Sequence, residues 1–185
     1  GMFGNRVAVR VDGIPIVPGG PNWMDAPLHY APIQQLENLT IYRGIAPVSA
    51  GAETIGGTVV AETRRAEFAS GSAFNTRARA TSGFQGNGNV FTAGVFAAAS
   101  NDTHRLHVAA DYIDGDDRDF SSDDNGTIAG TRGEKIDFSL GYGLRIDDHQ
   151  FSIDYRRHET DDTGNPSLPA DIRIIDTDLI KAAYQ

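Results

Sequence analysis

The most constraining feature of this chain is a strict alternation of apolar and polar side chains in its second half. Within residues 135–146 every second residue is apolar, and the residues between are polar, charged or glycine. The apolar positions are Ile136, Phe138, Leu140, Tyr142, Leu144 and Ile146, and they alternate with Asp137, Ser139, Gly141, Gly143 and Arg145. Because neighbouring side chains of a β-strand point to opposite faces, this segment predicts a strand with one apolar and one polar face.

The length of this pattern favours a strand that crosses a membrane. Tilted bilayer-spanning strands need about 9–11 residues and keep apolar side chains toward lipid and polar ones toward the lumen. The same alternation recurs in residues 104–113 and 150–157, where the apolar positions include Leu106, Val108, Tyr112, Phe151, Ile153 and Tyr155. We therefore predict strands of a transmembrane β-barrel. A soluble all-β sandwich that serves as a ligand-binding or adhesion module is the alternative.

The composition is compatible with both of these readings. The mean hydropathy is -0.33, but barrel strands dilute their apolar residues with polar ones, so this value does not separate a barrel from a soluble domain. No run approaches the ~18 apolar residues of a spanning helix. The net charge of -9 disfavours a nucleic-acid partner, which requires clusters of Lys and Arg.

The chain divides by pattern into two parts. Residues before about 66 contain short strand patterns separated by glycine- and proline-rich loops, with strands expected at 6–11, 39–43 and 58–63 and a helical turn at 33–36. From Phe74 onward we expect six longer strands, at 74–84, 89–100, 104–113, 135–146, 150–157 and 174–184. Tight turns at 86–88, 101–103 and 147–149 and long connections at 114–133 and 158–173 are expected, and we predict that short and long connections alternate. Outer-membrane barrels combine short periplasmic turns with long extracellular loops.

Three blocks in the first part, taken in order, resemble the plug domain of TonB-dependent outer-membrane receptors. They are Val9–Pro15 (VRVDGIP), Leu36–Gly44 (LENLTIYRG) and Gly51–Val59 (GAETIGGTV). The strands that follow resemble the start of the barrel of that family. The resemblance covers essentially the whole chain.

The resemblance implies an all-β-dominated fold in two domains. Residues 1–66 would be a partial plug domain, and residues 67–185 would be about six antiparallel, up-and-down strands of an outer-membrane barrel that is incomplete in this chain. Both ends look cut, so we expect an excerpt of a longer protein. The segment that contacts the energising protein TonB would precede residue 1.

The same resemblance implies a receptor in the bacterial outer membrane that imports a scarce nutrient, such as an iron–siderophore or another metal chelate. Cobalamin, other metals and glycans are the alternative ligands. Its partners would be TonB, the small-molecule ligand and outer-membrane lipid. Ligand capture would involve the plug apices, formed by Gly19, Gly20, Asn22, Trp23, Met24, His29, Val48, Ser49 and Ala50. Trp23, Met24 and His29 could grip an aromatic chelate or a soft metal ion. Packing of Trp23 and Met24 beneath a loop is the other reading.

Charged residues on the polar strand faces are candidates for contacts between plug and barrel. They are Glu37, Arg43, Arg77, Arg79, Asp137, Arg145 and Asp154. Polar, hydrated contacts would hold a plug and still let it move, because they exchange with water at low net cost. The other reading is that these charges only solvate the lumen.

The sequence predicts no enzyme, no cofactor and no dedicated metal site. It lacks a Gly-x-Ser-x-Gly motif and a phosphate-binding glycine loop. The acidic segment at 114–124 lacks the spacing and the closing Glu of a calcium loop, so a solvated loop is favoured there. His104, His107, His149 and His158 show no recurring ligand spacing, although His107 is expected to face the lumen.

Overall fold

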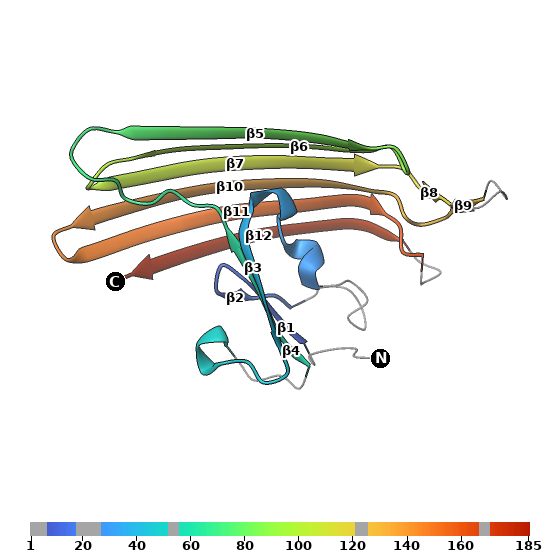
Figure 1. Cartoon of the computed structure of the whole chain (residues 1–185), viewed down its shortest axis with the longest axis horizontal. Helices are drawn as coiled ribbons and strands as arrows, with labels where there is room; N and C mark the ends of the chain where they lie inside the picture. Colours follow the sequence, from blue (N-terminus) through green and yellow to red (C-terminus); the bar gives the residue numbers. More distant parts are fainter. Residues whose placement is uncertain (1–6, 18–26, 52–55, 121–125, 167–170) are drawn as a thin grey trace. The chain divides into compact units, whose positions relative to one another are not determined.

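The fold is known from a computed structural model that describes residues 7–17, 27–51, 56–120, 126–166 and 171–185 (Figure 1). It divides into a first unit, Gly1–Arg64, and a second unit, Arg65–Gln185. Each unit has its own sheet. Within the described residues, no helix has the length and apolar character needed to cross a membrane.

The first unit is built on a four-stranded sheet with the order β2-β1-β4-β3. Its strands are β1 (Val7–Val11), β2 (Ile14–Pro15), β3 (Leu36–Arg43) and β4 (Gly57–Thr63). β1 pairs parallel with β4, and the other pairs are antiparallel. Pro15 lies in the edge strand β2, where a missing backbone donor is tolerated. The described residues of this unit also form the short 3-10 helices η2 (Pro27–Tyr30), η3 (Ile33–Gln35) and η4 (Val48–Ala50).

A small core and a tight hairpin hold the first unit together. Val11, Ala31 and Ala61 are buried against one another. Asp12 and Gly13 form the turn between β1 and β2 with φ values of 53° and 80°, as expected for an Asp-Gly hairpin turn. The buried Asp12 carboxylate accepts hydrogen bonds from the backbone N–H and the hydroxyl of Thr63, both at 2.8 Å. Asp12 therefore ties the turn to the end of β4.

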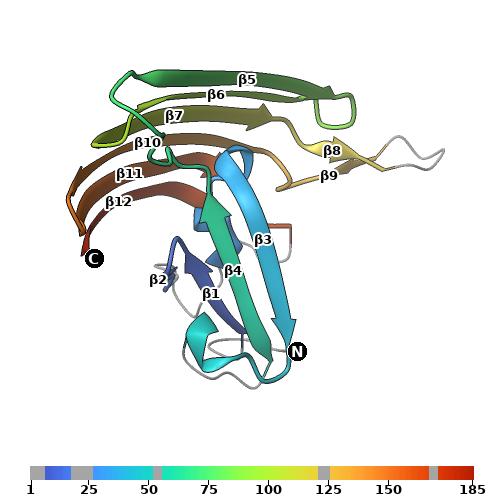
Figure 2. The same cartoon turned by 60° about the vertical axis from the view of Figure 1, so that its left-hand side comes forward.

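The second unit is a six-stranded antiparallel meander with the order β12-β11-β10-β7-β6-β5. Its long strands are β5 (Asn75–Gln85), β6 (Val90–Ser100), β7 (His104–Gly115), β10 (Gly133–Ile146), β11 (His149–Thr163) and β12 (Ile172–Tyr184). Figure 2 shows the sheet as a curved surface whose strands run side by side. The sheet does not close within this chain, and β5 and β12 are its edges.

The connections differ in length at the two ends of this sheet. At one end are tight turns, Asn101–Thr103 and Asp147–Asp148. At the other end, residues 116–132 carry the small hairpin of β8 (Arg118–Asp119) and β9 (Thr127–Ile128), and residues 164–171 join β11 to β12. The turn at residues 86–89 between β5 and β6 is short, although it lies at the same end of the sheet as the two long connections. Short and long connections therefore do not alternate throughout.

The largest error in a predicted boundary concerns the fifth strand. The sequence placed the end of the fifth strand at Arg157 and assigned residues 158–173 to a loop, but β11 continues to Thr163 and β12 begins at Ile172. The apolar alternation stops after Tyr155 because both faces of β11 become polar from that point. Strand pairing nevertheless continues, with His158 opposite Asp137 and Thr160 opposite Lys135.

Candidate functional site

On the six-stranded sheet the apolar face is exposed and the polar face is buried, which is the reverse of the arrangement in a soluble protein. On β10 the apolar residues Phe138, Leu140 and Tyr142 are 37%, 43% and 40% exposed, while Asp137 is only 3% exposed. The neighbouring strands repeat this arrangement, with exposed Leu106, Val108, Phe151, Ile153 and Ile180. Soluble monomers rarely expose contiguous apolar patches of this kind, which mark an interaction with a partner or a membrane.

Buried polar groups line the other face, which we call the inner face. His158 Nδ1 lies 2.8 Å from Asp137 Oδ1, and the Thr160 hydroxyl lies 3.0 Å from His158 Nε2. All three side chains are buried. Burying a polar group costs free energy unless the group is hydrogen-bonded. The hydrogen bonds among these three residues therefore offset the cost of burying them.

Glycines on the inner face make room for charged side chains of adjacent strands. A Cβ atom on Gly141 would overlap the ring of His107 from β7 and the carboxylate of Asp154 from β11. Asp154 lies 3.7 Å from the Arg65 guanidinium and 3.9 Å from His107 Nε2. The glycines of the alternating pattern therefore let side chains from both neighbouring strands lie across β10.

The segment that precedes β5 is fixed to the inner face. Ala66 is buried with Phe96, Ala98 and Ala109. The Phe68 ring lies beneath two guanidinium groups, 4.9 Å from that of Arg105 and 4.1 Å from that of Arg145. Such cation–π contacts contribute about 0.5–1 kcal/mol at exposed sites and more when desolvated. The backbone of this segment also bonds to the β6–β7 turn, through Ala69 N–H to Asn101 O and Asp102 N–H to Gly71 O.

Arg132 joins the two long connections at the opposite end of the sheet. Its guanidinium lies 2.9 Å from Asp171, 3.6 Å from Asp162 and 4.0 Å from Asp117. The hydrogen bonds that this guanidinium donates to Asp171 and Asp162 raise its pKa above the usual value. Arg132 therefore remains charged and crosslinks both connections.

Asp117 organises the first of these connections. Its Oδ1 accepts the backbone N–H groups of Thr131 at 2.7 Å and Arg132 at 2.9 Å. Desolvation acts to raise the pKa of this carboxyl, but the backbone hydrogen bonds and the Arg132 charge outweigh it, so the pKa is lowered. The charged form of Asp117 is the one that holds the connection.

Comparison with solved structures identifies the fold. The copper transporter OprC matches with a TM-score of 0.85 at 21% sequence identity, over 99% of this chain and 27% of that one. An apoprotein form of the FrpB iron transporter from Neisseria meningitidis matches with a TM-score of 0.67 at 15% identity, over 97% and 29%. The ferric enterobactin receptor PfeA from Pseudomonas aeruginosa, as a G324V mutant, matches with a TM-score of 0.61 at 13% identity, over 97% and 30%.

This chain has the fold of TonB-dependent receptors. That fold combines a plug with a barrel, and the predicted fold class is confirmed. The chain spans less than a third of the length of the three structures just described. No protein-family model and no curated protein sequence matches it.

The residues predicted for ligand capture in a TonB-dependent receptor fall in the first unit. Gly19, Gly20, Asn22, Trp23 and Met24 lie outside the described residues. His29 is in η2, with its ring edge-on to Tyr30. Val48, Ser49 and Ala50 form η4, where Val48 is exposed and Ala50 is buried. Their role in binding stays a prediction.

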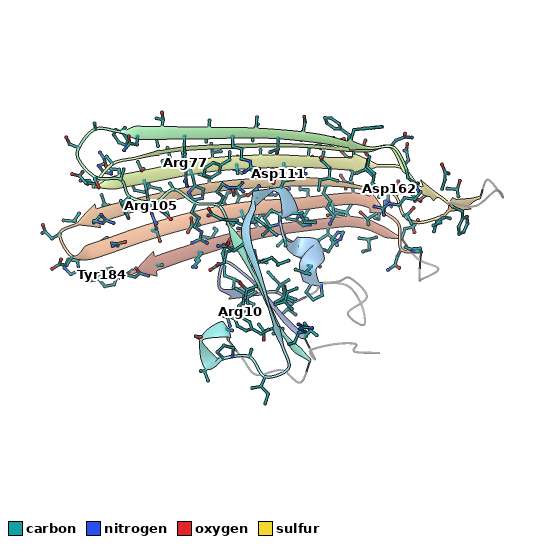
Figure 3. The ribbon with its side chains drawn as sticks, in the orientation of Figure 1. Arg10, Arg77, Arg105, Asp111, Asp162 and Tyr184 are labelled. Carbon is teal, nitrogen blue, oxygen red and sulfur yellow. The ribbon has the colours of Figure 1, made fainter. Side chains whose placement is uncertain are left out.

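The residues predicted for plug–barrel contacts lie on both units. Glu37 and Arg43 are exposed on β3. In the second unit, Arg77 bonds to Arg65 O and lies over the Phe96 ring, and Arg79 is exposed on the same strand. Asp137, Arg145 and Asp154 contact His158, Phe68 and Arg65. Figure 3 labels Arg77, Arg105 and Asp111 on this sheet. Whether these residues hold a plug stays a prediction.

Several residues of the inner face and of the two long connections were not predicted from the sequence. His158 and Thr160 were assigned to a loop, and no role was given to Phe68 or Arg132. Extending the strand register past Tyr155 would have found His158, because it pairs with Asp137. Phe68 and Arg132 carry no comparable signal, since their contacts depend on tertiary structure.

We predict that Gly141→Ala destabilises the sheet by about 1–3 kcal/mol, because overpacking forces neighbouring side chains to shift. The displaced groups are His107 and Asp154, so the Arg65 ion pair is disturbed as well. Denaturant unfolding of the intact receptor measures the loss. Gly86→Ala is the matched control, because a Cβ atom there meets no atom within 4 Å. Equal stability of the two variants would contradict this role of Gly141.

We predict that the 116–132 connection loosens in acid. A carboxyl whose pKa is lowered by folding adds stability above its unfolded pKa and loses it as the pH falls through the folded value. Hydrogen-exchange protection of the Thr131 and Arg132 amides should persist to about pH 5 and weaken below about pH 4, the ordinary range of aspartate. Asp117→Asn should abolish this pH dependence. If the protection of these amides still depended on pH in Asp117→Asn, a group other than Asp117 would be responsible.

Proposed function

We propose that this chain is part of a bacterial outer-membrane receptor that captures a scarce nutrient and imports it with energy supplied through TonB. The observation that carries this proposal is the exposure of large apolar side chains on one face of the sheet. Phe138, Leu140 and Tyr142 are all exposed on β10, while Asp137 and Ser139, on the other face of the same strand, are buried. This distribution matches strands that have lipid outside and a polar lumen inside.

The soluble alternative is disfavoured by the same face. A β-sandwich buries its apolar faces between two sheets about 10 Å apart. In the described part of the second unit, the other sheet is the two-stranded β8–β9 hairpin, and Phe138, Leu140 and Tyr142 remain exposed. A membrane satisfies this surface without a second sheet.

The polar inner face supports a transport path. Ion pairs and hydrogen bonds such as Asp154 with Arg65 and Asp137 with His158 can exchange with water at low net cost. If the contacts between plug and barrel were apolar instead, opening a path for the ligand would expose apolar surface to water, which is unfavourable. We infer that the first unit is part of the plug and that ligand capture involves residues 19–24 and 48–50, followed by rearrangement of the plug.

The inferred cargo is a metal chelate. OprC is described as a copper transporter, FrpB as an iron transporter and PfeA as a ferric enterobactin receptor. All three descriptions name a metal, and that of PfeA names a metal chelate, which supports a metal-containing ligand for this receptor. The uptake experiment below identifies the metal.

The lipid-facing assignment predicts that Leu140→Arg impairs assembly of the intact receptor in the membrane. A charge on the lipid face near the bilayer midplane costs about 2–4 kcal/mol, against about 0–1 kcal/mol near an interface. Ile146→Arg is the control, because it places the same charge at the turn end of the same strand. Outer-membrane fractionation and heat-modifiable gel mobility measure assembly. Equal assembly of both variants would argue against a lipid-facing β10.

The transport proposal predicts chelate uptake that requires both this receptor and TonB. Bacteria expressing the intact receptor should accumulate radiolabelled iron or copper from at least one added chelate. The accumulation should disappear when either the receptor or TonB is deleted. Accumulation that persists without TonB would refute energised import by this receptor.

A further inference from the structure

An apolar groove lies on the exposed face of the sheet near its tight-turn end. Its volume is about 410 Å³, and it is lined mainly by Tyr142, Leu144, Phe151, Ile153, Ala182 and Tyr184. The size falls within the ~300–1,000 Å³ range of small-molecule sites. The register places Tyr142, Ile153 and Ala182 in one row across β10, β11 and β12. Ala182 is the smallest of these three side chains.

Aromatic side chains form one wall of the groove and carry its polar rim. The Phe151 and Tyr184 rings lie 4.9 Å apart, and Tyr184 stacks on His149 at 5.8 Å. The Tyr184 hydroxyl lies 2.7 Å from His149 Nδ1. With this hydroxyl donating to Nδ1, the neutral imidazole carries its proton on Nε2, where it is a donor for an anion. Tyr184 is labelled at the end of β12 in Figure 3.

Two acidic residues directly precede His149 in the chain. Asp147 and Asp148 form the β10–β11 turn, and both are exposed. The turn at this end of the sheet therefore carries one hydrogen-bond donor, His149 Nε2–H, and two negative charges. A phosphate could accept from His149, and an ammonium group could pair with the turn carboxylates.

The opposite end of the same face has a different character. There Arg157 lies within ion-pair distance of Glu159, Asp176 and Asp178. Its positive charge is already engaged by carboxylates, so this end does not offer a comparable phosphate site. The combination of an apolar groove, a hydrogen-bond donor and carboxylates occurs at the tight-turn end.

We infer that this groove binds one zwitterionic phospholipid, phosphatidylethanolamine, in the periplasmic leaflet. An acyl chain lies in the groove over Ala182, the phosphate accepts a hydrogen bond from His149 Nε2–H, whose tautomer the Tyr184 hydroxyl fixes, and the ammonium group pairs with Asp147 and Asp148. This inference rests on the proposed function, because it requires the exposed face to meet a bilayer and the tight turns to face the periplasm.

Native mass spectrometry of the detergent-solubilised intact receptor tests this binding. The probes are dioleoyl-phosphatidylethanolamine and dioleoyl-phosphatidylglycerol, added separately at equal concentration. We expect the wild-type protein to favour phosphatidylethanolamine by about fivefold, the scale of one net hydrogen bond or ion pair. The double variant Asp147→Asn with Asp148→Asn should abolish this preference. A wild-type protein without the preference would overturn the assignment of the headgroup.

Substitutions in the groove test the site itself. Ala182→Leu should fill the groove and reduce bound phosphatidylethanolamine at least severalfold, and Ala97→Leu, at an exposed position on β6, should leave it unchanged. Tyr184→Phe keeps the ring and removes the hydroxyl, so it should weaken binding even if Ala182→Leu misfolds. Unchanged binding in both Ala182→Leu and Tyr184→Phe would overturn the inference. A wild-type receptor that stays monodisperse without detergent would instead overturn the proposed function.

Discussion

The pleat of the β-strand is the constraint on which this structure depends. Because successive side chains point to opposite faces, one sequence can present two unrelated surfaces along the same backbone. In β10 these surfaces are Phe138, Leu140 and Tyr142 on one side and Asp137 and Ser139 on the other. A shift of the strand register by one residue would exchange the two faces. The register of strand pairing is therefore set by which side chains must face the apolar and the polar surroundings. The six-stranded sheet is therefore specified by what each face contacts as well as by its hydrogen bonds.

The inner face shows how charged groups are accommodated on such a sheet. Gly141 and Gly143 carry no side chain, so His107, Asp154 and Arg105 from the neighbouring strands can lie across β10. The alternation thus has two kinds of inner position, those that supply a polar group and those that leave space for one. This division explains why glycine is frequent on the same face as Asp137 and Ser139.

The sequence predicted the strands best where one face is apolar and the other polar. β10 was placed within two residues at its start and without error at its end. The extension of β11 from His158 to Thr163 was not predicted, because charged residues on both faces there carry no period of two. The β1–β2 turn followed from Asp12-Gly13, whose backbone preference is local. The positions of Phe68, Arg132 and the Asp137–His158–Thr160 chain depend on neighbours distant in sequence, and no local pattern encodes those neighbours.

The anchoring of residues 65–71 has a mechanical consequence. Phe68 is held beneath Arg105 and Arg145, and Ala69 and Gly71 are bonded to the β6–β7 turn. Tension applied along the chain from the first unit would reach these contacts before it reached β5. The strand ladder would thus be shielded from pulling, and the first unit could unravel or shift while its point of attachment to the sheet remained stationary.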